Sequence, residues 1–335
     1  MVAGGTMRAR AARMTRVAAL DCGTNSLRLL IADVDTARAE LTDVVRRMEI
    51  VRLGQGVDQT GRLAPEALAR TARVLRDYAE VIAARGAGAV RMVATSATRD
   101  ASNAAEFSGQ VKEILGVAPD VVTGAQEAEL SFAGATAELA TAGGGPYLVT
   151  DIGGGSTEFV LGAAARTGAC QPERAVHGIS VNVGCVRMTE RHLHGDPPSR
   201  PEVMAATADI DAALDQVTGA IPVRRARTLI GLAGSVTTVA GIAMGLPAYD
   251  ADRIHHARIS AADVHAVTAD LLAQTRVQRA AIGVMHPGRV DVIGAGALVL
   301  DRIMQRFGFS ELLVSEHDIL DGMAWSLAGT HPAEQ

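Results

Sequence analysis

Residues 151–158 read Asp-Ile-Gly-Gly-Gly-Ser-Thr-Glu and directly follow the strand-like run 147–150, Tyr-Leu-Val-Thr. Glycines let the backbone approach a ligand closely, and consecutive turn amides form a concave site for an anion. Serine and threonine hydroxyls add hydrogen-bond donors. An aspartate beside such a turn can hold Mg²⁺, which prefers oxygen ligands and usually bridges to phosphates. This stretch therefore predicts a phosphate-binding hairpin.

The same pattern occurs once more, near the start of the chain. Residues 21–29 read Asp-Cys-Gly-Thr-Asn-Ser-Leu-Arg-Leu, between the apolar run Val17–Leu20 and a strand-like run over Leu27–Val34. Both copies consist of a strand, the pattern Asp-x-Gly-x-x-Ser, and a second strand. Such an internal repeat indicates two related domains, each opening with a phosphate-type hairpin. A length of 335 residues also suits two domains.

Outside the hairpins, short apolar runs alternate with segments of helical periodicity, which predicts an α/β architecture. We expect further strands over 90–94, 121–122, 228–232 and 312–314, and helices over 65–85, 103–115, 126–139, 261–272, 291–303 and 318–327. The run 141–146, Thr-Ala-Gly-Gly-Gly-Pro, is typical of a linker. We therefore expect an N-terminal domain over 15–138 that is completed by a C-terminal helix over 317–330, a second domain over 139–316, and a flexible N-terminus over 1–14.

Composition excludes several classes of protein. The net charge of −5 argues against a protein that coats DNA or RNA, because that requires a basic surface. The three cysteines, Cys22, Cys170 and Cys185, form no Cys-x-x-Cys pair, which argues against a disulfide framework or zinc ribbon and suits the reducing cytoplasm. Residues 1–16 lack the apolar segment of a secretory signal. The apolar stretch Leu229–Leu246 is long enough for a membrane span, but its interrupting glycines and hydroxyls favour a buried strand, loop and helix.

Two common phosphate motifs, the P-loop and a Gly-x-Gly-x-x-Gly turn between a strand and a helix, are absent from the sequence. The two hairpins, with Gly-Leu-Ala-Gly-Ser-Val-Thr-Thr at 231–238, resemble instead the phosphate motifs of the superfamily of actin, sugar kinases and heat-shock chaperones. More closely, the chain resembles the Ppx/GppA family of exopolyphosphatases and guanosine pentaphosphate phosphatases, over about residues 17–325. The segments that carry this match are 21–29, 94–101, 123–128 and 151–158, with support from 184–190 and 289–296.

The resemblance implies two ribonuclease-H-like (actin-like ATPase) α/β domains with a cleft between them. It implies Glu127 as the general base, and Asp151 and Glu158 as ligands of a divalent metal, Mg²⁺ or Mn²⁺, with K⁺ as a further candidate cofactor. The residues expected to bind phosphate are Gly23, Thr24, Asn25, Ser26, Arg99, Gly153, Gly154, Gly155, Ser156, Thr157, Gly234 and Ser235. We expect a cytoplasmic homodimer that acts on polyphosphate or guanosine pentaphosphate and binds neither DNA nor membranes.

The sequence departs from the family at three places. The family usually has two adjacent glutamates where this chain has Gln126-Glu127. Residues 318–322, Asp-Ile-Leu-Asp-Gly, lack the arginine of the family's Gly-Leu-Arg-Glu-Gly-like segment. Longer members carry an additional helical region, and we do not expect it here. The last difference puts processive grip on long polyphosphate in doubt and favours short chains.

Alternatives stay open at this point. A guanosine pentaphosphate phosphatase fits the same motifs, since both substrates end in a phosphoanhydride. A nucleotide-binding scaffold without turnover is a third reading, against which Glu127 argues. For a sugar kinase, we find no clear aspartate base. Individually, Glu127 could be a helix-surface carboxylate, Arg99 could pair with Asp100, and Ser235 could form a turn. We expect surface or structural roles for His192, His194, His255 and His256, and a helix N-terminus at His317-Asp318.

Overall fold

The computed structural model describes residues 14–139, 145–163 and 177–330. The first sheet has the strand order β3-β2-β1-β4-β5. Its strands are β1 (Met14–Cys22), β2 (Ser26–Asp35), β3 (Glu40–Ile50), β4 (Ala89–Ala94) and β5 (Asp120–Val121). β1, β2 and β3 are antiparallel neighbours, whereas β4 and β5 run parallel to β1. This is the ribonuclease-H-like arrangement predicted for the first domain.

The second sheet repeats this order. Its strands are β6 (Tyr147–Ile152), β7 (Thr157–Gly162), β8 (His177–Val181), β9 (Thr228–Leu232), β10 (Arg258–Ser260) and β11 (Glu311–Val314). β8, β7 and β6 are antiparallel, β9 and β11 continue the sheet in parallel, and β10 adds an antiparallel edge. The internal repeat and the predicted fold class are therefore confirmed.

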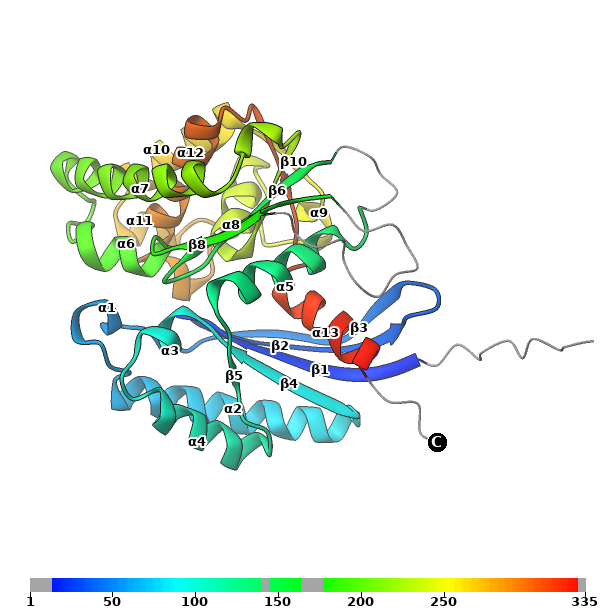
Figure 1. Ribbon diagram of the computed structural model, residues 1–335. Helices are drawn as coiled ribbons and strands as arrows, with labels where there is room; N and C mark the ends of the chain where they lie inside the picture. The colour runs from blue at the N-terminus through cyan, green and yellow to red at the C-terminus, as the bar shows by residue number, and fades with distance from the viewer. Residues whose placement is uncertain (1–13, 140–144, 164–176, 331–335) are drawn as a thin grey trace, which may run out of the picture.

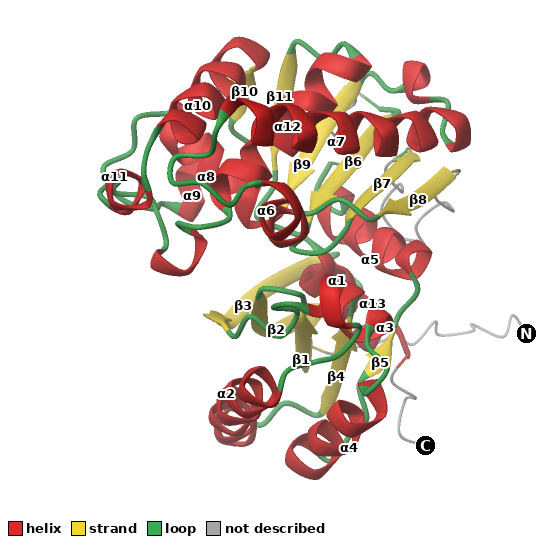
Figure 2. Cartoon of the chain, turned by 90° about the vertical axis from the view of Figure 1, so that its left-hand side faces the viewer, coloured by secondary structure: helices red, strands yellow, loops and turns green. Residues whose placement is uncertain are grey.

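Two helices cover the face of the first sheet that points away from the second sheet (Figure 2). They are α2 (Pro65–Arg85) and α4 (Ala104–Leu115). Proline in the first turn and a left-handed glycine after the last turn set the limits of α2, because proline needs no N–H there and Gly86 adopts φ 66° without steric cost. Two short helices, α1 (Val57–Thr60) and α3 (Ser96–Asp100), lie at the end of the sheet that faces the cleft.

Two helices lie between the sheets (Figure 1): α5 (Gly124–Thr136) and α13 (Ile319–Thr330). α13 packs on the first sheet, whereas α5 buries Phe132 against the second. The helices cross through Gly134 and Gly322, since a Cβ on either glycine would overlap the backbone of the other segment. α5 thus covers the second sheet although it precedes residue 139, where we placed the domain boundary; that boundary stays a prediction.

The remaining helices enclose the second sheet. They are α6 (Cys185–His192), α7 (Arg200–Ala220), α8 (Ala233–Ala243), α9 (Ala251–Ile254), α10 (Ala261–Ala273), α11 (Arg276–Ala280) and α12 (Ile293–Phe307). The apolar stretch 229–246 forms the buried strand β9 and the helix α8, as predicted, but the predicted loop between them is absent, because α8 begins at Ala233 directly after Leu232. Across the described residues, no helix has the length and apolarity needed to cross a bilayer. The predicted flexible N-terminus except Met14, linker residues 141–144 and Cys170 lie outside the described residues.

Candidate active site

The two predicted hairpins have the same turn. Gly23 N–H donates to the Ser26 carbonyl, and Gly153 N–H to the Ser156 carbonyl, both at 3.0 Å. The turns touch across the cleft, because a Cβ on Gly154 would lie 2.9 Å from Thr24 Cβ and one on Gly155 would lie 2.5 Å from Ser96 Oγ. Only glycine therefore allows the two hairpins to meet.

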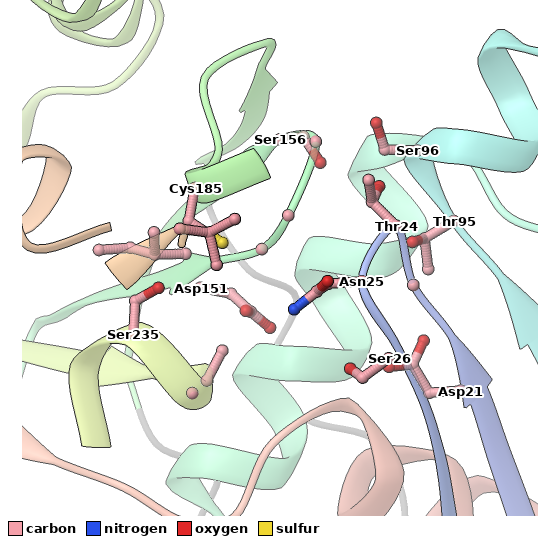
Figure 3. Close-up of a pocket in the computed structure, with 18 of the residues that line it drawn as sticks. Asp21, Thr24, Asn25, Ser26, Thr95, Ser96, Asp151, Ser156, Cys185 and Ser235 are labelled. Atoms are coloured by element: carbon pink, nitrogen blue, oxygen red, sulfur yellow. The ribbon is translucent and has the colours of Figure 1, made fainter. Parts of the chain in front are cut away.

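The hairpins and the turns after β4 and β9 line a partly open cavity of about 90 Å³. Figure 3 shows Asn25 and Asp151 pointing toward one another across it. Its polar and glycine lining residues are Asp21, Gly23, Thr24, Asn25, Ser26, Arg28, Thr95, Ser96, Glu127, Asp151, Gly153, Gly154, Gly155, Ser156, Gly234, Ser235 and Arg289. The volume suits one small anion and is far below the ~300–1,000 Å³ typical of pockets that enclose drug-sized ligands.

Glu127 lies in the first turn of α5, with its carboxylate at the cavity. Arg99 Nη1 donates to Glu127 Oε2 at 2.6 Å and to the Val122 carbonyl at 2.9 Å. Burial raises the pKa of Glu127 to about 7, although the charge of Arg99 offsets part of that effect. A carboxylate poised near neutral pH and held in one orientation suits general base catalysis.

Two further carboxylates lie side by side on the second hairpin. Asp151 accepts a hydrogen bond from Ser131 Oγ, and Glu158 Oε1 accepts from Ser156 Oγ and Ser180 Oγ, each at 2.7 Å. Burial, followed by the negative charge of Asp318, raises the pKa of Asp151 to about 6. Burial, followed by the charge of Glu127, raises the pKa of Glu158 well above its usual value.

Two guanidinium groups enter the cavity. Arg28, opposite Asp21 in the β1–β2 register, donates to Asp21 Oδ2 through Nε at 3.0 Å and Nη2 at 2.7 Å, and pairs with Asp318 through Nη1. Arg289 lies over Gly234, where any Cβ would overlap it. Among the described residues, the one hydrogen bond of its guanidinium group goes to Thr238 Oγ1 at 3.2 Å. Arg289 therefore keeps donors free for an anion.

The charges of the site fit a divalent cation. Asp21, Glu127, Asp151, Glu158 and Asp318 face or adjoin three guanidinium groups, those of Arg28, Arg99 and Arg289. When all are ionised, two negative charges stay uncompensated. Asp21 Oδ1 and Glu158 Oε2 are buried and have no hydrogen-bond partner within the described part of the chain. Carboxylate oxygens with unused lone pairs are the ligands that Mg²⁺ prefers.

This arrangement predicts how the stability of the metal-free protein depends on pH. Glu127 and Asp151 hold protons in the folded state up to about pH 7 and 6, but lose them near pH 4 when unfolded. Their contribution to stability is therefore complete below about pH 4 and is lost as the pH rises through 6 and 7.

We expect the melting temperature in EDTA to fall between pH 5 and 8, and added Mg²⁺ to raise it more at pH 8, by about 5 °C. Thermal unfolding at several pH values, with Glu127→Gln as a comparison whose pH dependence is weaker, tests this. A melting temperature in EDTA that rises over this range contradicts the assignment.

The model of the Ppx/GppA phosphatase family matches residues 30–331. The chain belongs to this family. It is 51% identical over 327 residues to exopolyphosphatase 2 of Mycobacterium tuberculosis. This alignment covers 94% of this chain and 99% of that protein. The crystal structure of an exopolyphosphatase-like protein matches with a TM-score of 0.86 and 42% identity, over 93% of this chain and 97% of that one. A guanosine-5'-triphosphate,3'-diphosphate pyrophosphatase of Aeromonas salmonicida is 26% identical, over 94% of this chain and 60% of that protein.

The family resemblance seen in the sequence is thus confirmed, and most residues that it implied meet at one cavity. Three of them do not line it. Arg99 reaches it only through Glu127. Thr157 is buried and donates its hydroxyl proton to the Val183 carbonyl at 2.6 Å. Glu158 lies behind Ser156, which occupies the cavity wall. The roles assigned to these residues stay predictions.

The structure explains two departures of this Ppx/GppA chain. Gln126 does not line the cavity, because its side-chain carbonyl accepts from the Thr123 N–H at 2.9 Å in a capping box. The changed C-terminal segment brings carboxylates toward the first sheet, where Asp318 pairs with Arg28 and Asp321 pairs with Arg46 at 2.6 Å. Asp318 also caps α13 as expected, since its Oδ1 accepts from Leu320 N–H at 3.1 Å.

Two of the histidines set aside in the sequence lie in a separate group with Glu138, whose side-chain ligand atoms are all within 4.8 Å of one another: His255 and His317. His255 Nδ1 accepts from the Glu316 N–H at 3.1 Å, so its proton lies on Nε2, which faces Glu138 at 3.2 Å. A ring nitrogen that bears a proton cannot bind a metal. This arrangement therefore favours the structural role that we expected for His255.

Arg28, Arg289, Thr95 and Ser96 line the cavity, although the sequence suggested no role for them. For Arg28, Thr95 and Ser96, comparison of the two copies of the repeat could have indicated a place in the site. Arg28 occupies the hairpin position of Glu158, and Thr95-Ser96 follows β4 as Ala233-Gly234-Ser235 follows β9. Arg289 has no counterpart in the repeat, and only the tertiary fold brings it to Gly234.

Proposed function

We propose that the protein is an exopolyphosphatase that releases terminal orthophosphate from inorganic polyphosphate. The observation that carries the proposal is the cavity in which Glu127 faces two phosphate-type hairpins. The identity of 51% to a whole exopolyphosphatase supports the choice of substrate. A cavity of about 90 Å³ admits the terminal phosphate and leaves the rest of the chain outside.

The residues of the cavity divide the chemistry between them. Backbone N–H groups of the two turns, together with Arg289, bind the oxygens of the terminal phosphate. Glu127, oriented by Arg99, holds a water and takes its proton as the water attacks phosphorus and the bond from phosphorus to the bridging oxygen breaks. Phosphoryl transfer depends mainly on such positioning and on charge neutralisation.

We propose Mg²⁺ or Mn²⁺ as the cofactor, held by Asp151 with Asp21 and Glu158 close by. When bound, the metal neutralises charge on the phosphate oxygens. Arg28 keeps Asp21 in one orientation, so that the unpaired Oδ1 of Asp21 stays available to the cation.

A substrate panel tests the proposal. Polyphosphates of graded length, guanosine pentaphosphate and ATP are compared by phosphate release in the presence of Mg²⁺. We expect kcat/KM for polyphosphate to exceed that for guanosine pentaphosphate at least about tenfold. A preference for guanosine pentaphosphate would replace this proposal by the second candidate, which the Aeromonas relative represents. Tight nucleotide binding without release from any substrate would favour a scaffold.

A further inference from the structure

The phosphate turn of the second hairpin is held from behind by α6. The first N–H groups of this helix donate to the turn: Cys185 to the Gly153 carbonyl at 3.0 Å, and Val186 and Arg187 to the Gly154 carbonyl at 2.9 and 3.1 Å. These bonds satisfy carbonyls of the turn on the side of the helix. The start of the helix therefore anchors the turn.

The side chain of Arg187 extends this attachment to the first domain. Its Nε donates to the Gly155 carbonyl at 2.6 Å. Its Nη1 pairs with Asp58 in α1, and its Nη2 pairs with Asp100 in α3 at 2.5 Å and contacts Ser96 Oγ at 3.3 Å. One guanidinium thus joins the phosphate turn of one domain to two helices of the other.

This junction is closely packed. The side chain of Arg187 is 10% exposed and that of Asp58 is 16% exposed. The cavity beside them, which Thr24, Gly155 and Glu190 also line, measures about 10 Å³, room for at most about one water. The pair of Arg187 with Asp58 is thus shielded, and charge-assisted hydrogen bonds of this kind are stronger and more directional than surface ion pairs. Asp100, whose side chain is 37% exposed, lies at the edge of the junction.

Arg191 provides a contrast on the same helix. It also pairs with Asp58, through Nε at 2.7 Å, and with Asp209 at 3.0 Å, but it makes no hydrogen bond to the turn within the residues described. Both arginines therefore help to hold the two domains together, whereas Arg187 also contacts the turn.

We propose that Arg187 is a positioning residue for the reaction, which sets the phosphate turn 153–155 in its productive geometry only when the first domain closes onto it. The inference rests on the proposed function for its substrate but not for its contacts. Without the Nε bond of Arg187 and its anchors on Asp58 and Asp100, the turn is no longer held in its position against Thr24 and Ser96.

Kinetics of Arg187→Lys and Arg191→Ala test the proposal. Lysine keeps the charge but cannot bridge three acceptors in one plane. We expect kcat of Arg187→Lys to fall about 30-fold with KM changed less than about threefold, because misplacement of a reacting group affects mainly the chemical step. We expect Arg191→Ala to keep kcat within about threefold. Added guanidinium ion should raise kcat of Arg187→Ala but not that of Arg191→Ala.

Hydrogen–deuterium exchange supplies a measurement that does not depend on turnover. The amides of 185–187 should exchange faster in Arg187→Lys than in the wild type, and should be unchanged in Arg191→Ala. Equal kcat losses in both arginine variants, or wild-type kcat and exchange in Arg187→Lys, would overturn the proposal. If the wild type releases no phosphate from any substrate, the proposed function fails, while the exchange result still decides the role of Arg187.

Discussion

Glu127→Gln is expected to lower kcat for phosphate release about a thousandfold, within the range that general base catalysis contributes. The amide keeps the size of the side chain, and its oxygen can still accept from Arg99, but it cannot take a proton from water. The melting temperature should stay the same or rise, because a buried carboxylate with a raised pKa is replaced by a neutral group. Single-turnover release of phosphate measures the loss.

The matched control is Glu129→Gln, two residues further along α5 and exposed to solvent. It should leave kcat unchanged. In the wild type, kcat should rise with pH through about 7, the pKa of Glu127, whereas the residual activity of the variant should not follow this titration. More than about a tenth of the wild-type kcat in Glu127→Gln would show that another group removes the proton.

The second large effect is expected on stability. In Gly134→Ala, the new methyl group would overlap the Asp318 carbonyl and lie within 3.0 Å of Gly322 N. α5 and α13 would have to separate, at a cost of about 3 kcal/mol, the upper part of the usual range for overpacking. Asp318 would move with α13 and release Arg28, so kcat should fall as well. Unfolding in urea measures the first effect and phosphate release the second.

Gly109→Ala is the matched control for this variant. Gly109 lies in α4, where a Cβ would meet nothing within 4 Å. The same substitution should raise the free energy of unfolding by about 0.5–1 kcal/mol, because alanine loses less backbone entropy in a helix. Equal stabilities for Gly134→Ala and the wild type would contradict the close crossing of α5 and α13.

Local patterns predicted the parts of the fold whose causes are local. Both hairpins follow from Asp-x-Gly-x-x-Ser, because the glycine and serine close the turn by themselves. β3 was not predicted, since five of its eleven residues are charged and its apolar residues do not alternate. α7 was also missed, although Ser199 and Glu202 form a capping box that marks its start.

The sequence identified many residues of the site, but not the ion pairs that these residues form with one another. Glu127 and the turn residues could be named from motifs, but the ion pair of Glu127 with Arg99 joins residues 28 apart in sequence. The pair of Arg28 with Asp318 spans 290 residues. No periodicity or spacing encodes such contacts, because they depend on how α5 lies beside α3 and on how α13 packs on the first sheet.

The pairing of Arg28 with Asp318 has a consequence for synthesis on the ribosome. Arg28 emerges 290 residues before Asp318. Until α13 has emerged, Val17, Leu30 and Val34 on one face of the first sheet lack the side chains that cover them. Chains still being translated must therefore expose this apolar face, which makes it a target for chaperones during translation. Arg28 is paired with Asp21 alone until Asp318 has emerged and α13 has packed on the sheet.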